Sequence, residues 1–142
     1  MSKKPFCEED YRIDNSSHCP IVDVLVGKTN QKITTYVDTG CTSGIALLQS
    51  QIGNLSLGEK INDEPVPVLV GDGHKVGADV YIASVELNGE KKDVEIHAID
   101  PTKMLGSAPV KECIPCLGRE FLDHYDIHFT GNERFGILRF YK

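Results

Sequence analysis

The stretch Tyr36-Val37-Asp38-Thr39-Gly40-Cys41-Thr42-Ser43-Gly44 decides how this chain is interpreted. Its first residues continue a run rich in β-branched and aromatic side chains, which is typical of a strand. Asp38 stands where that run ends, and a small hydroxyl residue and a glycine follow it. The pattern therefore predicts a carboxylate presented on a turn at the end of a strand. The Asp38-Thr39-Gly40 triplet occurs once in 142 residues, which matters for any chemistry that needs two carboxylates.

Length and composition indicate a globular protein with one main domain. The chain has 142 residues, 40% of them hydrophobic and 25% charged, which is an ordinary balance for a folded domain. Fifteen basic and twenty-one acidic residues give a formal net charge of −6. This charge and the lack of a basic cluster argue against a nucleic acid as partner. No segment has the roughly 18 apolar residues of a membrane span, so no membrane partner is expected.

The cysteines and the first residues predict a cytoplasmic location. Positive charge at residues 1–5 is not followed by an apolar run, so we expect no signal peptide. The number of cysteines is odd, so they cannot all pair within the chain. Reduced thiols in a cytosolic compartment are the simpler interpretation. The five are Cys7, Cys19, Cys41, Cys113 and Cys116.

Turn residues divide the chain into short β-rich runs. Residues 1–19 are polar and irregular, and we expect an N-terminal arm there, followed by one domain over residues 20–142. Hairpins are predicted around residues 27–30, 71–74 and 87–90, because Gly, Asp-Gly and Asn-Gly turns stand between β runs. The runs that they join are 21–26 with 32–37, 66–70 with 75–85, and 80–87 with 93–99.

The remaining segments complete a mostly β architecture. Residues 43–52 are apolar without alternation, so a short strand and a helical turn remain equally possible. Residues 119–125 are the best helix candidate, about two turns long. Two last β runs, 126–129 and 135–141, end the chain, and apolar residues on both faces of the second predict that it is buried, at a dimer contact.

The ordered set of these features resembles the retropepsin-like aspartic proteases, the single-domain branch that includes the retroviral proteases. The resemblance spans about residues 20–141. It rests on the Asp38-Thr39-Gly40 triplet after a hairpin, a glycine-rich flap hairpin around Gly71-Asp72-Gly73-His74, and the segment Cys116-Leu117-Gly118-Arg119 that enters the helix candidate. It implies a closed barrel of the acid-protease half type, with a flap hairpin and one short C-terminal helix.

The resemblance also implies an activity: an aspartic endopeptidase that cuts extended polypeptide. Two carboxylates that share one proton can activate a water and polarise the scissile carbonyl. One triplet supplies one carboxylate, so the chain is expected to act as a homodimer in which Asp38 meets its symmetry mate. By position, Thr39 inherits a bond across the dimer axis, and Gly40 can offer its N–H to the carboxylate. No cofactor is expected.

The flap and the segment after it are expected to bind substrate. Flap backbone groups would bond to an extended peptide, and Leu117-Gly118 would also pack behind the catalytic loop. The expected substrate contacts are Leu69, Val70, Gly71, Asp72, Gly73, His74, Cys116 and Leu117.

Two departures from the family pattern carry expectations of their own. Cys41 stands where relatives carry Ser, Thr or Ala, and a thiol donates a weaker hydrogen bond than a hydroxyl. We therefore expect activity that extends toward neutral pH. Thr42 replaces the aspartate that retroviral members pair with the arginine after the Leu-Gly segment, so Arg119 must find another partner.

Several alternatives remain open on the sequence alone. A catalytically silent module could use the same groove for peptide binding or dimerisation. A second acid from the same chain is the weaker alternative, since no candidate stands in a second triplet; the candidates are Asp14, Asp72, Asp100 and Asp123. Zinc could be held by Cys113 and Cys116 with Cys7 and Cys19, or by His124 and His128, but reduced thiols without metal are the main prediction. If Cys41 and Cys116 both border the site, their oxidation would disturb it.

Overall fold

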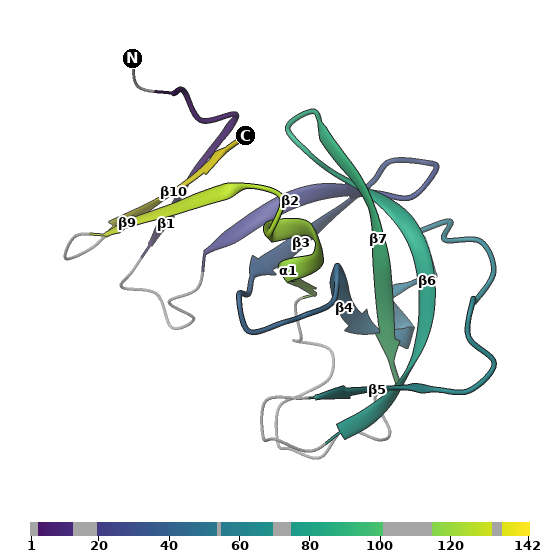
Figure 1. Ribbon diagram of the computed structural model, residues 1–142. Coiled ribbons are helices and arrows are strands. Elements are labelled where there is room, and N and C mark those ends of the chain that lie inside the picture. Colours follow the sequence, from purple (N-terminus) through teal and green to yellow (C-terminus); the bar gives the residue numbers. More distant parts are fainter. Residues whose placement is uncertain (1–2, 13–19, 54, 70–74, 101–114, 132–134) are drawn as a thin grey trace.

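The computed structural model describes residues 3–12, 20–53, 55–69, 75–100, 115–131 and 135–142, and the fold over them is mostly β, as predicted (Figure 1). Ten strands are joined by one 3-10 turn and one short helix. They are β1 (Cys7–Arg12), β2 (Ile21–Val26), β3 (Gln31–Val37), β4 (Ile45–Leu48), η1 (Gln49–Gln51), β5 (Val66–Leu69), β6 (Lys75–Leu87), β7 (Glu90–Ile99), β8 (Cys116–Leu117), α1 (Arg119–Leu122), β9 (Asp126–Gly131) and β10 (Phe135–Tyr141).

Seven strands form a sheet that closes on itself. Their order is β2-β3-β8-β4-β7-β6-β5, and β2 also pairs with β6 through Leu25 and Val26. This additional pairing joins the two sides of the sheet into a barrel, which confirms the predicted closed architecture. Within it, β8 is parallel to β3 and antiparallel to β4, so two residues of a late segment lie between two early strands.

The core follows from the alternation of side chains along these strands. Val22, Val24 and Val26 of β2 are at most 1% exposed, and the residues between them face outward. The long strand β6 buries one face near β5 and the opposite face near β2. Val76 and Ala78 pack in a small cluster with Leu48 and Ile99, while residues 83, 85 and 87 join the main core. One strand therefore serves both the barrel core and the base of the β5–β6 hairpin.

Turn chemistry is confirmed where the structure describes it. Asn88 and Gly89 have φ of 45° and 88°, the left-handed pair that a type I′ turn requires between β6 and β7. Residues 43–52 contain both expected alternatives, since β4 runs directly into η1. The helix is shorter than predicted. Only Arg119–Leu122 is α-helical, and the chain then continues as a turn in which Tyr125 N–H bonds to Leu122 O at 3.0 Å.

The expectation that residues 1–19 form an irregular arm outside the core is wrong for β1. Cys7–Arg12 pairs antiparallel with β10 along its whole length, and β9 completes a three-stranded sheet in the order β1-β10-β9. Cys7 is 2% exposed and belongs to the main core. Phe6 packs against the rings of Tyr125 and Phe140 at 5.0 and 6.1 Å. Residues 13–19 lie outside the described part of the chain.

The strand β10 is buried on one face, which bears out part of the expectation for it. Leu138 and Phe140 are fully buried, while Ile137, Arg139 and Tyr141 on the other face are half-buried. Among the residues that the structure describes, no helix is long and apolar enough to cross a bilayer.

Removal of residues 1–12 tests whether β1 is an integral strand. The truncation deletes the partner of β10 and the Phe6 and Cys7 side chains, so we expect the free energy of unfolding to fall by at least about 2 kcal/mol. Removal of residues 1–4, which include the exposed Lys3 and Lys4, should leave it unchanged. Urea denaturation of both truncated proteins measures the difference. Equal stability of the two would mean that β1 adds nothing to the fold.

Candidate active site

Backbone hydrogen bonds fix the position of Asp38. The residue follows the last residue of β3, and its N–H donates to the carbonyl oxygen of Leu117 in β8 at 3.0 Å. Its side-chain Oδ1 accepts the Gly40 N–H at 2.9 Å, and its carbonyl oxygen accepts the Cys41 N–H at 3.2 Å. The carboxylate is half-buried, while Thr39 and Gly40 are exposed. The turn therefore holds the acid in one orientation and leaves its outer side open.

A second loop supports the first from behind. Gly118 donates to Gly44 O at 2.9 Å, and the next residue, Arg119, donates to Cys41 O at 2.8 Å. A Cβ atom on Gly118 would overlap the carbonyl oxygen of Ser43 and lie 2.8 Å from Cys41 Sγ. Only glycine lets the two loops approach this closely.

Gly44 makes the corresponding contact on the other side of the Asp38 loop, which we define as residues 38–44 between β3 and β4. Its N–H donates to Glu95 O in β7 at 3.1 Å, and a Cβ atom there would overlap the side chain of Val94. The loop is thus pressed between β7 and the start of α1.

Cys41 lies inside this packed region. Burial raises the pKa of its thiol above the ordinary value of 9.0; the backbone N–H and the hydroxyl of Ser43 lower it, and the charge of Asp38 raises it. The thiol therefore stays protonated at neutral pH. Because the thiolate is the form that oxidants attack, this does not favour the redox control considered for Cys41.

Sequence reasoning missed a polar cluster behind the loop. Ser43 Oγ lies 2.7 Å from His97 Nδ1, and His97 Nε2 lies 3.1 Å from Glu95 Oε2. Glu95 and His97 are two apart on β7, so they share a face of the strand, but 54 residues separate His97 from Ser43. Only the parallel pairing of β4 with β7 brings the two segments together.

Arg119 pairs with Asp123, which agrees with the expectation that Thr42 leaves it to find another partner. Its Nη2 lies 3.3 Å from Asp123 Oδ2, one helical turn further on. Both side chains are more than half exposed, so the pair contributes at most about 1 kcal/mol. Its place at the surface also argues against Asp123 as a second catalytic acid.

The predicted substrate contacts are described only in part. Leu69 is the last residue of β5 and pairs with Lys75, while residues 70–74, with Val70, Asp72 and His74, lie outside the described part. Cys116 is half-buried between β3 and β4. The expectation that Leu117 touches substrate is wrong for its side chain, which is 0% exposed in the core. Its contribution to the site is the carbonyl that holds Asp38.

The zinc alternatives find little support among the described residues. Cys7 is in the core, where burial and then the charge of Glu9 raise its pKa to about 11, so it is a poor thiolate ligand. Cys19 and Cys113 lie outside the described part. The His128 ring contacts the Tyr141 ring at a tilt in the three-stranded sheet, and His124 packs edge-on against Tyr125 beyond α1.

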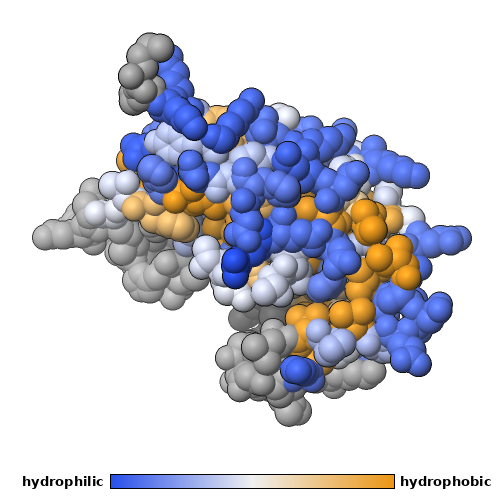
Figure 2. Space-filling view, viewed as in Figure 1, coloured by the Kyte–Doolittle hydropathy of each residue, from blue (hydrophilic) through white to orange (hydrophobic). Residues whose placement is uncertain are grey.

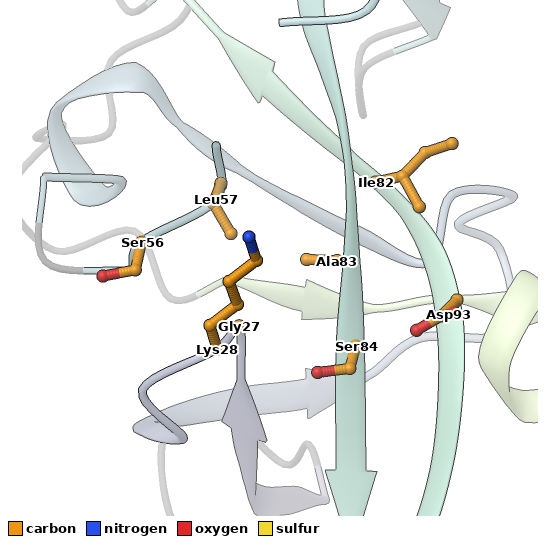
Figure 3. Close-up of a pocket in the computed structure, with 8 residues that line it drawn as sticks. All are labelled: Gly27, Lys28, Ser56, Leu57, Ile82, Ala83, Ser84 and Asp93. Atoms are coloured by element: carbon orange, nitrogen blue, oxygen red, sulfur yellow. The ribbon is translucent and has the colours of Figure 1, made fainter. Parts of the chain in front are cut away.

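An open pocket of about 230 Å³ lies away from Asp38 (Figure 3). Gly27 and Lys28 precede β3, whereas Asp38 follows it, and seven residues of strand separate the two ends by roughly 20 Å. Lys28 and Leu57 border the pocket on one side, with Ile82 and Asp93 on the other. The pocket therefore belongs to the opposite end of the barrel and is not part of the candidate active site.

Comparisons with known proteins agree with the fold. No protein-family model matches the chain, and no curated protein matches it in sequence. A solved structure of the EIAV protease, complexed with the inhibitor HBY-793, superposes with a TM-score of 0.57 at 18% identity, over 78% of this chain and 90% of that chain. The likeness shows that this chain has a retropepsin-like fold.

Gly118→Ala tests the close contact behind the Asp38 loop. The added methyl group meets backbone atoms, which cannot move as a flexible side chain can, so we expect a loss of about 1–3 kcal/mol of unfolding free energy or more. Gly53→Ala is the matched control, because nothing lies within 4 Å of the new methyl group and its effect should be close to zero. Denaturant unfolding of the two variants gives the comparison. Similar stabilities would show that the two loops do not need glycine.

Proposed function

We propose that the protein is an aspartic endopeptidase whose catalytic acid is Asp38. The observation that carries this proposal is the double restraint on Asp38, by Leu117 O at its backbone and by Gly40 N–H at its carboxylate. The Gly40 bond by itself is that of an ordinary Asx turn, but the added bond from Asp38 N–H to β8 fixes the turn in the barrel, and an acid that must meet a second carboxylate needs a fixed position. The retropepsin-like fold supports the same conclusion, since the Asp38 turn stands at the end of an inner strand of the barrel.

The proposed mechanism uses a pair of carboxylates related by a two-fold axis. Two carboxyl groups roughly 3 Å apart cannot both ionise, so they share one proton. The ionised member takes a proton from a bound water, and that water attacks the peptide carbonyl while the protonated member donates to the carbonyl oxygen. Collapse of the tetrahedral intermediate breaks the C–N bond as a proton reaches the leaving nitrogen. The substrate is an extended polypeptide.

The second carboxylate is proposed to come from a second copy of the chain. The sequence carries a single Asp-Thr-Gly triplet, so each copy of the chain brings one such acid. The outer strand β9 offers an edge for the partner, because its neighbour in the sheet is β10 on one side only. Five of its six residues are exposed, and Phe129 is 48% exposed. Figure 2 shows hydrophobic surface over β9 and β10.

Asp38→Asn is the direct test of activity. The amide preserves size and removes the ionisable group, so cleavage of a diverse peptide library between pH 4 and 8 should fall by about 10²–10⁴-fold or more. Asp123→Asn is the control, because this exposed carboxylate should leave cleavage unchanged. Cleavage that survives in Asp38→Asn would refute the assignment. If the wild type and Asp38→Asn both bind peptides but neither cleaves them, the chain is a silent binding module.

Mixing the wild type with Asp38→Asn tests whether each site needs two copies. If both carboxylates are needed and subunits exchange, an equimolar mixture retains about one quarter of the activity of the same total amount of wild type. If each chain needed only its own Asp38, the mixture would retain about one half of that activity. Activity should be measured after the subunits have had time to exchange.

Phe129→Glu tests the proposed edge. The charge would be buried between two copies of β9, so dimerisation should weaken by at least about tenfold and activity should depend more steeply on concentration. Ile82→Glu is a matched control, since Ile82 is 53% exposed on β6. Sedimentation of both variants over a concentration series measures the change. An unaltered dimer in Phe129→Glu would place the interface elsewhere.

A further inference from the structure

The cluster behind the Asp38 loop links it to a distant strand. Ser43 is 3% exposed and the His97 side chain is 12% exposed, while the carboxylate of Glu95 reaches solvent at 47%. The cluster therefore runs from the interior next to Cys41 to the surface of β7. Buried polar groups of this kind are worth keeping only when each has a partner.

The hydrogen bonds of the cluster run from Ser43 through His97 to Glu95. A carboxylate only accepts hydrogen bonds, so His97 donates one to Glu95 from its Nε2–H group. In the neutral imidazole Nδ1 is then an acceptor, and the Ser43 hydroxyl donates to it. The Ser43 side chain also adjoins Cys41. Ser43, His97 and Glu95 thus form one connected set of hydrogen bonds.

The elements around the cluster are themselves fixed. Glu95 N–H donates to Glu120 Oε1 of α1 at 3.1 Å, and Glu95 O accepts from Gly44 at 3.1 Å. Glu95 and Glu120 are thus the charged groups that adjoin the cluster through these contacts. These bonds fix the position of β7, so the His97 imidazole can restrain Ser43 through their hydrogen bond.

The arrangement is not a nucleophilic triad, although it contains the same residue types. A serine nucleophile must meet the substrate, and Ser43 is almost completely buried between the loop and β7. The cluster can position a neighbour, but it cannot attack one.

We propose that His97 is a positioning residue for the Asp38 loop and that it acts through its hydrogen bond to Ser43. Ser43 belongs to the loop that begins at Asp38, and it stands two residues after Cys41, whose N–H closes the Asp38 turn. The inference rests on the proposed function for its effect on turnover, but the restraint on the loop is a separate property. The bond to Ser43 carries the effect, and the bond to Glu95 serves to orient the ring.

Two amide substitutions separate the bonds of His97. Asn places an amide oxygen near the position of Nδ1, so His97→Asn keeps an acceptor for Ser43 and loses the bond to Glu95. Gln reaches the position of Nε2, so His97→Gln keeps a donor for Glu95 and loses the bond to Ser43. We expect His97→Gln to lower kcat by about tenfold or more with little change in KM, as for a misplaced catalytic group. His97→Asn should retain most of kcat.

Ser43→Ala completes a double-mutant cycle. It removes the same bond from the other end, so it should resemble His97→Gln, and the double variant should be no worse than either single variant. Urea unfolding of all variants shows whether the losses follow stability. Equal losses of kcat in His97→Asn and His97→Gln, additive losses in the cycle, or losses proportional to destabilisation would overturn the proposal.

Amide hydrogen exchange keeps the inference testable if no peptidase activity is found. The Asp38 N–H bonds to Leu117 O in β8 and the Cys41 N–H bonds to Asp38 O, so the peptide that contains residues 38–44 should exchange faster in His97→Gln than in the wild type. His97→Asn should exchange like the wild type. Unchanged exchange in His97→Gln would overturn the restraint, whereas absence of cleavage with the expected exchange would overturn only the proposed activity.

Discussion

The hydrogen bond from Asp38 N–H to Leu117 O is the interaction on which the site depends. It requires β8 to lie beside β3, and β8 reaches that place only because it also pairs with β4. The two residues of β8 thus lie between β3 and β4, which precede them by more than 60 residues in the sequence. Since the bond is between backbone atoms, no side-chain substitution at either residue removes it directly. The position of the acid is therefore a property of the barrel rather than of local turn chemistry.

The placement of β8 between β3 and β4 also explains where glycine is needed. Gly118 passes under the Asp38 loop where any side chain would overlap backbone, and Gly44 passes over β7 where it would overlap Val94. These contacts leave no room for a side chain at either glycine. Ser43 and His97, the polar side chains behind the loop, are hydrogen-bonded to each other. The rear of the loop is rigid and buried, while Thr39 and Gly40 at its front remain exposed. Such a division suits a catalytic group that must be fixed yet reachable.

Much of the barrel could be predicted because its signals are local. The Asn88-Gly89 turn and the alternation in β2 each follow from a few neighbouring residues. The strand β1 gave no such signal, since its sequence, Cys-Glu-Glu-Asp-Tyr-Arg, is mostly charged and only pairing with β10, more than 120 residues away, makes it a strand. The pairing of Ser43 with His97 was hidden for the same reason. Contacts of this kind depend on strand register, which single residues do not encode.

The open edge at β9 and the single triplet bear on the same question. A strand edge with an exposed Phe129 invites pairing with another chain, and proteins usually protect such edges with charge, proline or a covering segment. The titratable residues of β9 are Asp126 and His128, and proline is absent from the strand. A second copy paired there would remove the unprotected edge and supply the carboxylate that one chain lacks. In the proposed dimer, the partner would also have to cover the exposed front of the Asp38 turn.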